Sequence, residues 1–281
     1  MIREISSKII SETIEQMCIE ANLSLTQDVR DRLYNAEKTE SSFSGKKILG
    51  QLLENLEIAK SEQIPICQDT GMAVVFMEIG QDVHISGDSP EDAVNAGVRA
   101  GYEKGYLRKS VVSDPLIREN TGDNTPAILH TFIVPGDKIR ITVAPKGFGS
   151  ENMSRIYMLK PSDGIEGVKA AVIETVKLAG PNACPPMVVG VGIGGDFEKC
   201  ALLAKKALTR NMDESSEKPH IAALEKELLM ELNRTGIGPA GLSGDTTVLG
   251  VNIETYATHI AGLPCAINIC CHVNRHVTKE I

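Results

Sequence analysis

Three cysteines in this sequence lie where a thiolate could bind a metal group. Cys67 stands in PICQDTG, Cys184 in NACPPM and Cys271 in CCHVNRHV, each in a predicted loop or at the edge of a predicted element. Thiolates are soft ligands that favour zinc and iron–sulfur clusters. Their wide separations match no local ferredoxin or zinc-finger motif, however, and free cysteines are commonly small buried hydrophobic residues. The residue types alone therefore leave two interpretations open: ligands of one metal group, or buried thiols.

The other cysteines show fewer signs of chemistry. The sequence has seven cysteines, and an odd number without regular spacing does not indicate a disulfide framework. Cys18 and Cys200 fall inside predicted amphipathic helices, where we expect them to be buried. Cys265 and Cys270 belong to the last apolar segment of the chain, close to Cys271.

Composition excludes several classes of function. With 281 residues, 42% of them hydrophobic, the chain can bury a large core. The net charge of −8 argues against a nucleic-acid or anionic-membrane partner. No stretch approaches the roughly 18 apolar residues of a membrane span, and the first residues lack the pattern of a signal peptide. We therefore expect a cytoplasmic protein in which a few specific Arg or Lys side chains capture any anionic substrate.

Helices are predicted first in the N-terminal part. Hydrophobic periodicity predicts helices over 2–39 and 46–63, the second of them capped by Ser44. Ser89, followed by a proline and two acidic residues, begins a helix that reaches about Tyr106. Residues 1–60 would then form a mainly helical lobe.

Strands alternate with helices in the rest of the chain. A strand is predicted over 72–79, and the two sides of the PGDK turn within 128–145 should form a β-hairpin. The second half predicts helices over 164–180, 196–210 and 218–236, and strands over 187–195 and 246–258. This order favours a mixed α/β (α+β) fold, organised as a single domain over 1–281.

One glycine motif suggests a different chemistry. Residues 190–195 fit GxGxxG between a predicted strand and a predicted helix, which is typical of dinucleotide binding. The acidic residue expected about 20 residues later, at the end of a second strand, is missing, because Asp213 and Glu214 fall in a polar loop. We interpret the glycines as a tight strand-to-helix turn, with a dinucleotide-dependent dehydrogenase as an alternative.

Four motifs together resemble a known family. CQDTG, PKGFGSENMS, NACPPMVVGVGIGG and CCHVNR, in this order across nearly the whole chain, resemble the N-terminal cluster-binding domain of class I fumarate hydratases, and equally the α subunit of L(+)-tartrate dehydratase. The resemblance implies a [4Fe–4S] cluster held by three cysteines, with one iron left open. Carried over to this sequence, the ligands are Cys67, Cys184 and Cys271.

The third ligand has neighbours that could replace it. Cys271 matches the family best because its ligand stands four residues before an arginine, here Arg275, but Cys270 and Cys265 are close. A fourth ligand from either of them would favour a redox-sensing or electron-transfer protein. An open iron can instead act as a Lewis acid in adding water to a carbon–carbon double bond next to a carboxylate. His272 would be an outer neighbour of such a cluster at most.

The resemblance also implies residues that contact the substrate. Gln68 and Asp69 follow the first ligand, and Asp69 becomes a candidate for proton transfer, although DTG alone suits a plain turn. Arg108 would grip a carboxylate, against the alternative of a solvated arginine at a helix end. Gly149 would let the backbone approach the substrate. His259 would reach an active site, apparently that of a neighbouring subunit, where a lone histidine is otherwise commonly structural.

The resemblance predicts a partner and a small dicarboxylate substrate. Single-chain relatives of this class continue into a second domain, whereas this sequence ends at Ile281. We therefore expect a separate β subunit that completes the active site in an α2β2 or similar assembly, and little activity from α alone. The tract GFGSENMS favours fumarate and (S)-malate as the substrates, with L(+)-tartrate as the alternative.

Overall fold

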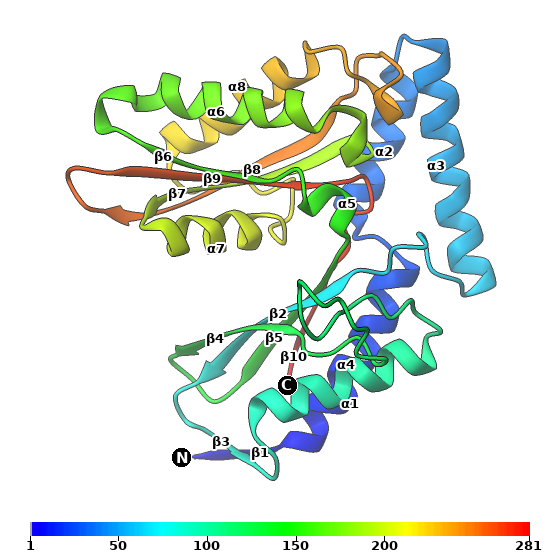
Figure 1. Ribbon diagram of the computed structural model, residues 1–281, viewed down its shortest axis with the longest axis vertical. Helices are drawn as coiled ribbons and strands as arrows, with labels where there is room; N and C mark the ends of the chain where they lie inside the picture. Colours follow the sequence, from blue (N-terminus) through cyan, green and yellow to red (C-terminus); the bar gives the residue numbers. More distant parts are fainter. Residues whose placement is uncertain (1) are drawn as a thin grey trace. The chain divides into compact units, whose positions relative to one another are not determined.

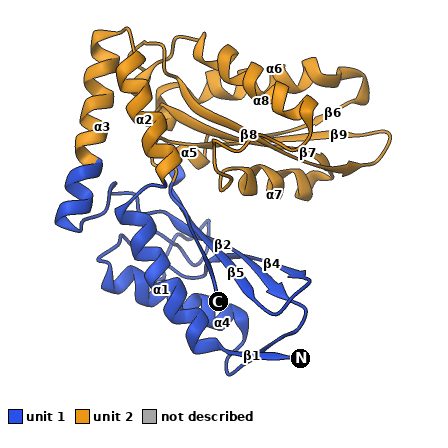
Figure 2. Ribbon diagram, turned by 180° about the vertical axis from the view of Figure 1, so that it is seen from behind, with its two compact units in different colours: residues 1–26, 56–148, 275–281 blue, residues 27–55, 149–274 orange. Residues whose placement is uncertain are grey.

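The computed structural model describes residues 2–281 as a mixed α/β fold (Figure 1). This confirms the predicted fold class. Contacts divide the chain into two compact units (Figure 2). Unit 1 contains the residues up to Thr26 together with Leu56–Phe148 and Arg275–Ile281, and unit 2 contains Gln27–Asn55 and Gly149–Asn274. A single domain over 1–281 stays a prediction, because compactness by contacts does not define a domain.

Unit 1 is built on a four-stranded sheet in the order β10-β5-β2-β4. The strands are β2 (Met72–Gly80), β4 (Ile128–Val134), β5 (Ile139–Lys146) and β10 (Val277–Glu280). Strand β2 is parallel to β4 and antiparallel to β5, and β10 is antiparallel to β5. Two short strands, β1 (Arg3–Ser6) and β3 (Val83–Ser86), form a separate parallel pair.

The predicted hairpin over 128–145 is wrong in its pairing. Both strands exist, but β2 lies between β4 and β5 and pairs with each of them. Strand β2 reaches the PGDK turn, where Gly80 N–H donates to Lys138 O at 2.8 Å and Gln81 N–H to Val134 O at 2.7 Å. Alternating apolar residues predict strands but do not specify their partners, because a strand buried between two others shows the same alternation.

Two helices of unit 1 pack on its sheet, α1 (Ser7–Leu23) and α4 (Pro90–Lys104). Ser89 caps α4 as predicted, and its Oγ accepts a hydrogen bond from Asp92 N–H at 3.1 Å. The apolar faces of both helices join residues of β2 and β5 in one core, of which Ile14, Val98 and Ile141 are fully buried members.

Residues 2–39 form three elements, not the single predicted helix. Strand β1 precedes α1, and α2 (Gln27–Thr39) begins a second helix in unit 2. Ser24 ends α1 in an extended conformation. A third helix, α3 (Phe43–Glu62), begins before the predicted cap Ser44 and crosses the division between the units after Asn55. The break between α1 and α2 was not predicted, because apolar residues keep a helical spacing on both sides of it.

Unit 2 is built on a second four-stranded sheet in the order β6-β9-β7-β8. Its strands are β6 (Arg155–Leu159), β7 (Met187–Gly195), β8 (Val248–Thr258) and β9 (Leu263–Cys270). Strand β7 is parallel to β8 and antiparallel to β9, so β8 is an edge strand. Strand β6 at the other edge was not predicted; it pairs with β9.

Helices cover both faces of this sheet (Figure 1). Helices α6 (Gly164–Ala179) and α8 (Pro219–Asn233) share a large core with the strands, and α7 (Phe197–Ala207) packs on the opposite face. A Cβ at Gly192 would lie 2.0 Å from the carbonyl oxygen of Cys200 in α7. Close packing of β7 on α7 therefore accounts for a glycine of the GxGxxG motif, as expected for a strand-to-helix turn. In residues 2–281, no helix is long and apolar enough to cross a membrane.

Candidate functional site

Accessibility divides the cysteines into two groups. Cys184 is exposed and Cys67 and Cys271 are partly exposed, and we call these three the accessible thiols. The others are buried, and burial raises the pKa of Cys18 and of Cys265 to about 12. Cys270, the last residue of β9, is also buried. The accessible thiols are the three that the family resemblance selected as ligands, whereas a buried thiol with a raised pKa is a poor source of thiolate.

Two of the accessible thiols lie in neighbouring segments of unit 2. Cys184 follows the short 3₁₀ helix η2 (Gly180–Ala183) with a positive φ of 51°, a conformation that non-glycine residues adopt mainly at functional or strained sites. His272 Nδ1 lies 3.0 Å from the carbonyl oxygen of Cys184. This contact brings the Cys184 loop next to the segment that carries Cys271.

The third accessible thiol belongs to unit 1. Cys67 lies between α3 and β2, and its Sγ is 3.4 Å from Oε1 of Gln68. Within residues 2–281 no group of three or more His, Cys, Asp or Glu side chains is already arranged around a metal position. Shared binding of one group by Cys67, Cys184 and Cys271 therefore stays a prediction.

The Asp69 loop, residues 67–71, is held by its own carboxylate. Asp69 Oδ1 accepts from Gly71 N–H at 3.0 Å, and Oδ2 accepts from Phe148 N–H at 2.9 Å. The first bond is the turn that DTG favours. The second fastens the KGFG tract to the loop. A Cβ at Gly147 would lie 3.0 Å from Asp69 Oδ2, which is tighter than most Cβ contacts, so glycine favours this approach.

Three buried polar residues hold the Asp69 loop, and one of them, Thr70, also bonds the main chain of Arg108. Thr70 Oγ1 donates to the carbonyl oxygen of Arg108 at 3.1 Å. Tyr102 OH lies 2.8 Å from Thr70 O and 3.0 Å from Gly71 O, and Asn124 Nδ2 donates to Gly71 O at 3.1 Å. Burial raises the pKa of Tyr102 far above its usual range, so its hydroxyl stays a donor. The structure thus brings Cys67, Gln68, Asp69 and Arg108 into one region of unit 1.

Sequence reasoning missed the residues that support this loop. Tyr102 lies on the buried face of α4, where the helical spacing of apolar residues indicates only core packing. Asn124 lies in a turn-rich segment, and its role follows from distant contacts that no local motif announces. Arg275 is the clearest omission: its Nε donates to Pro145 O at 3.1 Å and its Nη2 donates to Asp69 O.

The remaining predicted residues lie in unit 2. Gly149 is part of the short helix α5 (Phe148–Glu151), and an added Cβ would approach nothing more closely than Asn182 O at 4.0 Å. Packing therefore does not require a glycine there. His259 is exposed just beyond β8, lines an open cavity of about 510 Å³ with Lys199 and Tyr256, and its Nδ1 accepts from Ala261 N–H at 3.2 Å. In residues 2–281, the hydrogen bonds of His259 go to Ala261 and Gly262 and not to the accessible thiols.

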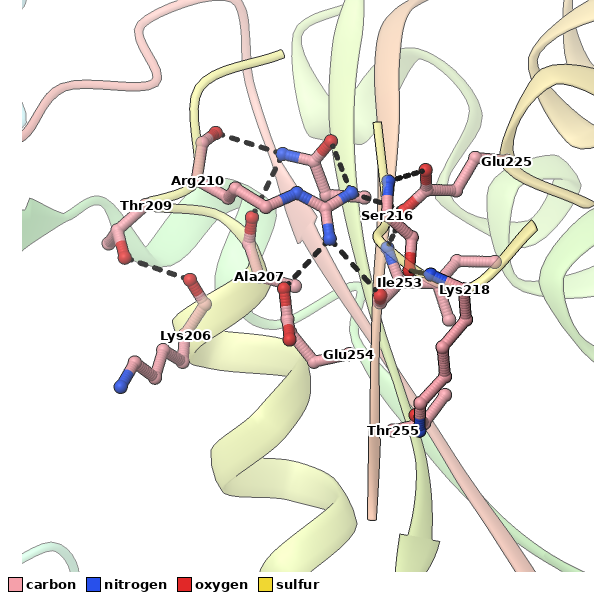
Figure 3. Close-up of polar contacts among 11 residues, drawn as sticks. Lys206, Ala207, Thr209, Arg210, Ser216, Lys218, Glu225, Ile253, Glu254 and Thr255 are labelled. Atoms are coloured by element: carbon pink, nitrogen blue, oxygen red, sulfur yellow. Dashed lines mark hydrogen bonds and ion pairs between the residues drawn. The ribbon is translucent and has the colours of Figure 1, made fainter. Parts of the chain in front are cut away.

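A second polar cluster in unit 2 serves the fold (Figure 3). Arg210, which follows α7, forms ion pairs with Glu225 of α8 and with Glu254 of β8. Glu225 Oε1 accepts from Ile253 N–H at 2.8 Å, and Arg210 Nη1 donates to Ile253 O at 3.3 Å. These side chains therefore occupy both main-chain groups of Ile253, one residue of the edge strand β8. Because the carboxylates of the cluster are already bound in this way, we infer that the cluster protects the edge strand β8 from pairing with another strand.

Comparisons with known proteins agree with the motifs. A family model described as fumarate hydratase (Fumerase) matches residues 11–280. The chain is 45% identical over 278 residues to a putative L(+)-tartrate dehydratase subunit alpha of Methanocaldococcus jannaschii, covering 97% of each chain. It is 32% identical over 272 residues to the L(+)-tartrate dehydratase subunit alpha of Escherichia coli strain K12, covering 96% of this chain and 89% of that protein.

Proposed function

Because the chain belongs to the fumarate hydratase (Fumerase) family and is thus a hydro-lyase, we propose that it is the α subunit of an iron–sulfur L(+)-tartrate dehydratase. The names of its relatives support tartrate over the fumarate that the GFGSENMS tract favoured. One structural observation carries the iron–sulfur part of the proposal. Of seven cysteines, the accessible ones are Cys67, Cys184 and Cys271, the three that the family resemblance selects as ligands.

The donor set fits a cluster with one open iron. Cys67, Cys184 and Cys271 would hold it, and Cys270 is unsuited to be a ligand because its thiol is buried at the end of β9. Three soft thiolates match an iron–sulfur cube and leave one corner without a protein ligand. When bound, the open iron supplies Lewis-acid activation of the hydroxyl that leaves as water.

The residues of unit 1 would bind and orient the substrate. Arg108 offers a planar, bidentate donor for a carboxylate, and Thr70 fixes its main chain next to the Asp69 loop. Asp69 is held by two main-chain N–H groups, but each carboxylate oxygen keeps a lone pair that can accept a proton or a hydrogen bond from a bound hydroxyl. Gln68 lies beside Cys67 and would contact the same substrate.

A separate β subunit would supply the rest of the active site. The relatives are named as alpha subunits, which supports a hetero-oligomer such as α2β2. His259 would act in this assembly, since it is exposed and, within residues 2–281, its imidazole bonds only the nearby Ala261 N–H. Gly149 would leave room for the substrate to approach the main chain.

The test is anaerobic co-expression of this chain with a candidate β chain from the same organism. Iron and sulfide are measured first, and then kcat/KM is compared for L(+)-tartrate, which loses water to give oxaloacetate, and for (S)-malate, which loses water to give fumarate. We expect cluster binding that each of Cys67→Ala, Cys184→Ala and Cys271→Ala abolishes, while the buried control Cys18→Ala retains it. A complex without iron, or one that retains the full cluster in all three variants, would refute the iron–sulfur proposal.

Fumarate hydration is the second candidate, because the matching family model is described as fumarate hydratase. Tartrate differs from malate by one hydroxyl. A pocket built to bond that hydroxyl should reject malate by a large factor, since its polar groups would be left unpaired. A kcat/KM for (S)-malate above that for L(+)-tartrate would establish the second candidate in place of the first.

A further inference from the structure

A buried guanidinium lies beside the Asp69 loop. Arg275 is only 4% exposed, although arginine is among the residues least often buried. Its Nε donates to Pro145 O and its Nη2 to Asp69 O, so one planar fork joins the end of β5 to the loop that carries Cys67. A lysine ammonium could not make these two bonds in the same geometry.

In the described residues no carboxylate forms a direct ion pair with this guanidinium, although the Asp69 carboxylate is a neighbour. The oxygens that Arg275 binds are main-chain carbonyls, and no ion pair of Arg275 occurs within residues 2–281. The Asp69 carboxylate instead accepts hydrogen bonds from the N–H groups of Gly71 and Phe148. Burial of a cation without an anionic partner costs free energy, which the native protein must offset in some other way.

One donor of Arg275 also has no partner. Its Nη1 is buried and makes no hydrogen bond. Buried donors are nearly always bonded to protein, to ordered water or to a bound group, so this donor is available to a ligand of the site. Thiolate ligands and the cluster they hold bring negative charge to Cys67, two residues before the Asp69 carbonyl that Arg275 holds.

We propose that Arg275 is the positioning residue and buried counter-charge of the cluster site. It fixes the main chain at Asp69, so that Cys67 and Gln68 keep their orientation, and Nη1 is the donor reserved for the anionic group bound at Cys67. This inference rests on the proposed iron–sulfur function. It assigns to Arg275 a role in retaining the cluster, distinct from substrate binding.

The test compares Arg275→Gln and Arg275→Lys with Arg140→Gln in the co-expressed complex. Arg140 is a matched control, because it is an exposed arginine of β5 in the same unit. The first measurement is the rate at which a chelator removes iron under anaerobic conditions. We expect Arg275→Gln to lose iron about 10-fold or more faster than wild type, as is usual when an outer partner of a metal ligand is removed. Arg275→Lys keeps the charge, so its rate of iron loss should lie between those of wild type and Arg275→Gln.

The second measurement does not depend on a bound cluster. Hydrogen exchange is followed in the same complexes after iron removal, in the peptides that contain Gly71 and Phe148. Faster exchange is expected in Arg275→Gln, with no change in Arg140→Gln. If Arg275→Gln fails to fold, the test rests on Arg275→Lys alone. Iron loss and hydrogen exchange both at wild-type rates in Arg275→Lys would then overturn the inference.

The outcomes separate this inference from the proposed function. A wild-type complex that binds the cluster, with Arg275→Gln retaining iron as firmly as Arg140→Gln, overturns the role of Arg275 and leaves the hydro-lyase proposal intact. A wild-type complex that never binds iron refutes the proposed function and the counter-charge with it. Faster iron loss and faster exchange together support the inference.

Discussion

Removal of the Glu225 carboxylate should destabilise unit 2 strongly. This side chain accepts from Arg210 Nη2, from Ile253 N–H at 2.8 Å and from Ser216 N–H at 3.1 Å (Figure 3). In Glu225→Ala all three donors lose their acceptor. Arg210 keeps its ion pair with Glu254, so its charge is not isolated.

The size of the effect follows from those three bonds. The two main-chain bonds contribute about 1 kcal/mol each and the bond from the Arg210 guanidinium about 1.5–3 kcal/mol, so Glu225→Ala should cost about 3.5–5 kcal/mol. For a chain of this size the melting temperature should fall by roughly 7–20 °C. The double variant Glu225→Ala/Arg210→Met should cost less than the sum of its single changes, because the Arg210–Glu225 ion pair is lost in each single variant but only once in the double variant.

Circular dichroism during urea unfolding measures the free-energy change, and hydrogen exchange at the Ile253 amide reports on the edge strand itself. Glu217→Ala is the control, since Glu217 is exposed in the same loop and should shift stability by no more than about 0.5 kcal/mol. A loss below about 1 kcal/mol in Glu225→Ala, or unchanged exchange at Ile253, would contradict our interpretation of the cluster.

Three further predictions concern thiols, glycines and pH. At pH 8 iodoacetamide should alkylate the accessible thiols of the cluster-free complex within minutes and leave the buried thiols unmodified. Mass spectrometry maps the modified cysteines, and equal labelling of both groups would contradict the burial pattern. Gly192→Ala should cost more than about 3 kcal/mol in urea unfolding, because its Cβ would meet Cys200 O at 2.0 Å, whereas Gly50→Ala in α3, with nothing within 4 Å, should add about 0.5–1 kcal/mol. Burial opposes ionisation of Asp123, but hydrogen bonds from Thr125 and Arg99 lower its pKa from 3.8 to about 2. Its contribution is therefore complete above about pH 4 and lost as the pH falls to about 2, so the stability difference between wild type and Asp123→Asn should shrink over that range; a constant difference would be inconsistent with the lowered pKa.

Local signals predicted most elements of this fold. Ser89 and Pro90 located the start of α4 because a capping side chain acts within its own turn. The pairing of β2 between β4 and β5 could not be predicted in this way, since it depends on contacts between residues far apart in the sequence. The break after Ser24 could not be predicted from the local pattern either, because the helical spacing of apolar residues continues across it.

The candidate site was predictable only where side chains act through a motif. Cys67, Gln68 and Asp69 are consecutive, so their resemblance to the family is visible in the sequence. Arg275 contacts Asp69 across more than 200 positions, and nothing in CCHVNRHV indicates that its guanidinium is buried or that Nη1 lacks a partner. Such roles depend on the folded main chain, which supplies the carbonyls that the arginine binds.

The return of the C-terminal segment to unit 1 has a consequence for biosynthesis. Strand β10 completes the sheet of the unit that also contains the first helix, so that sheet lacks an edge until residues 277–280 have left the ribosome. Unit 2 has all of its residues available once Asn274 has emerged. We therefore expect the sheet of unit 1, which contains the first-made helix, to be completed only after the last residues of unit 2 have been made.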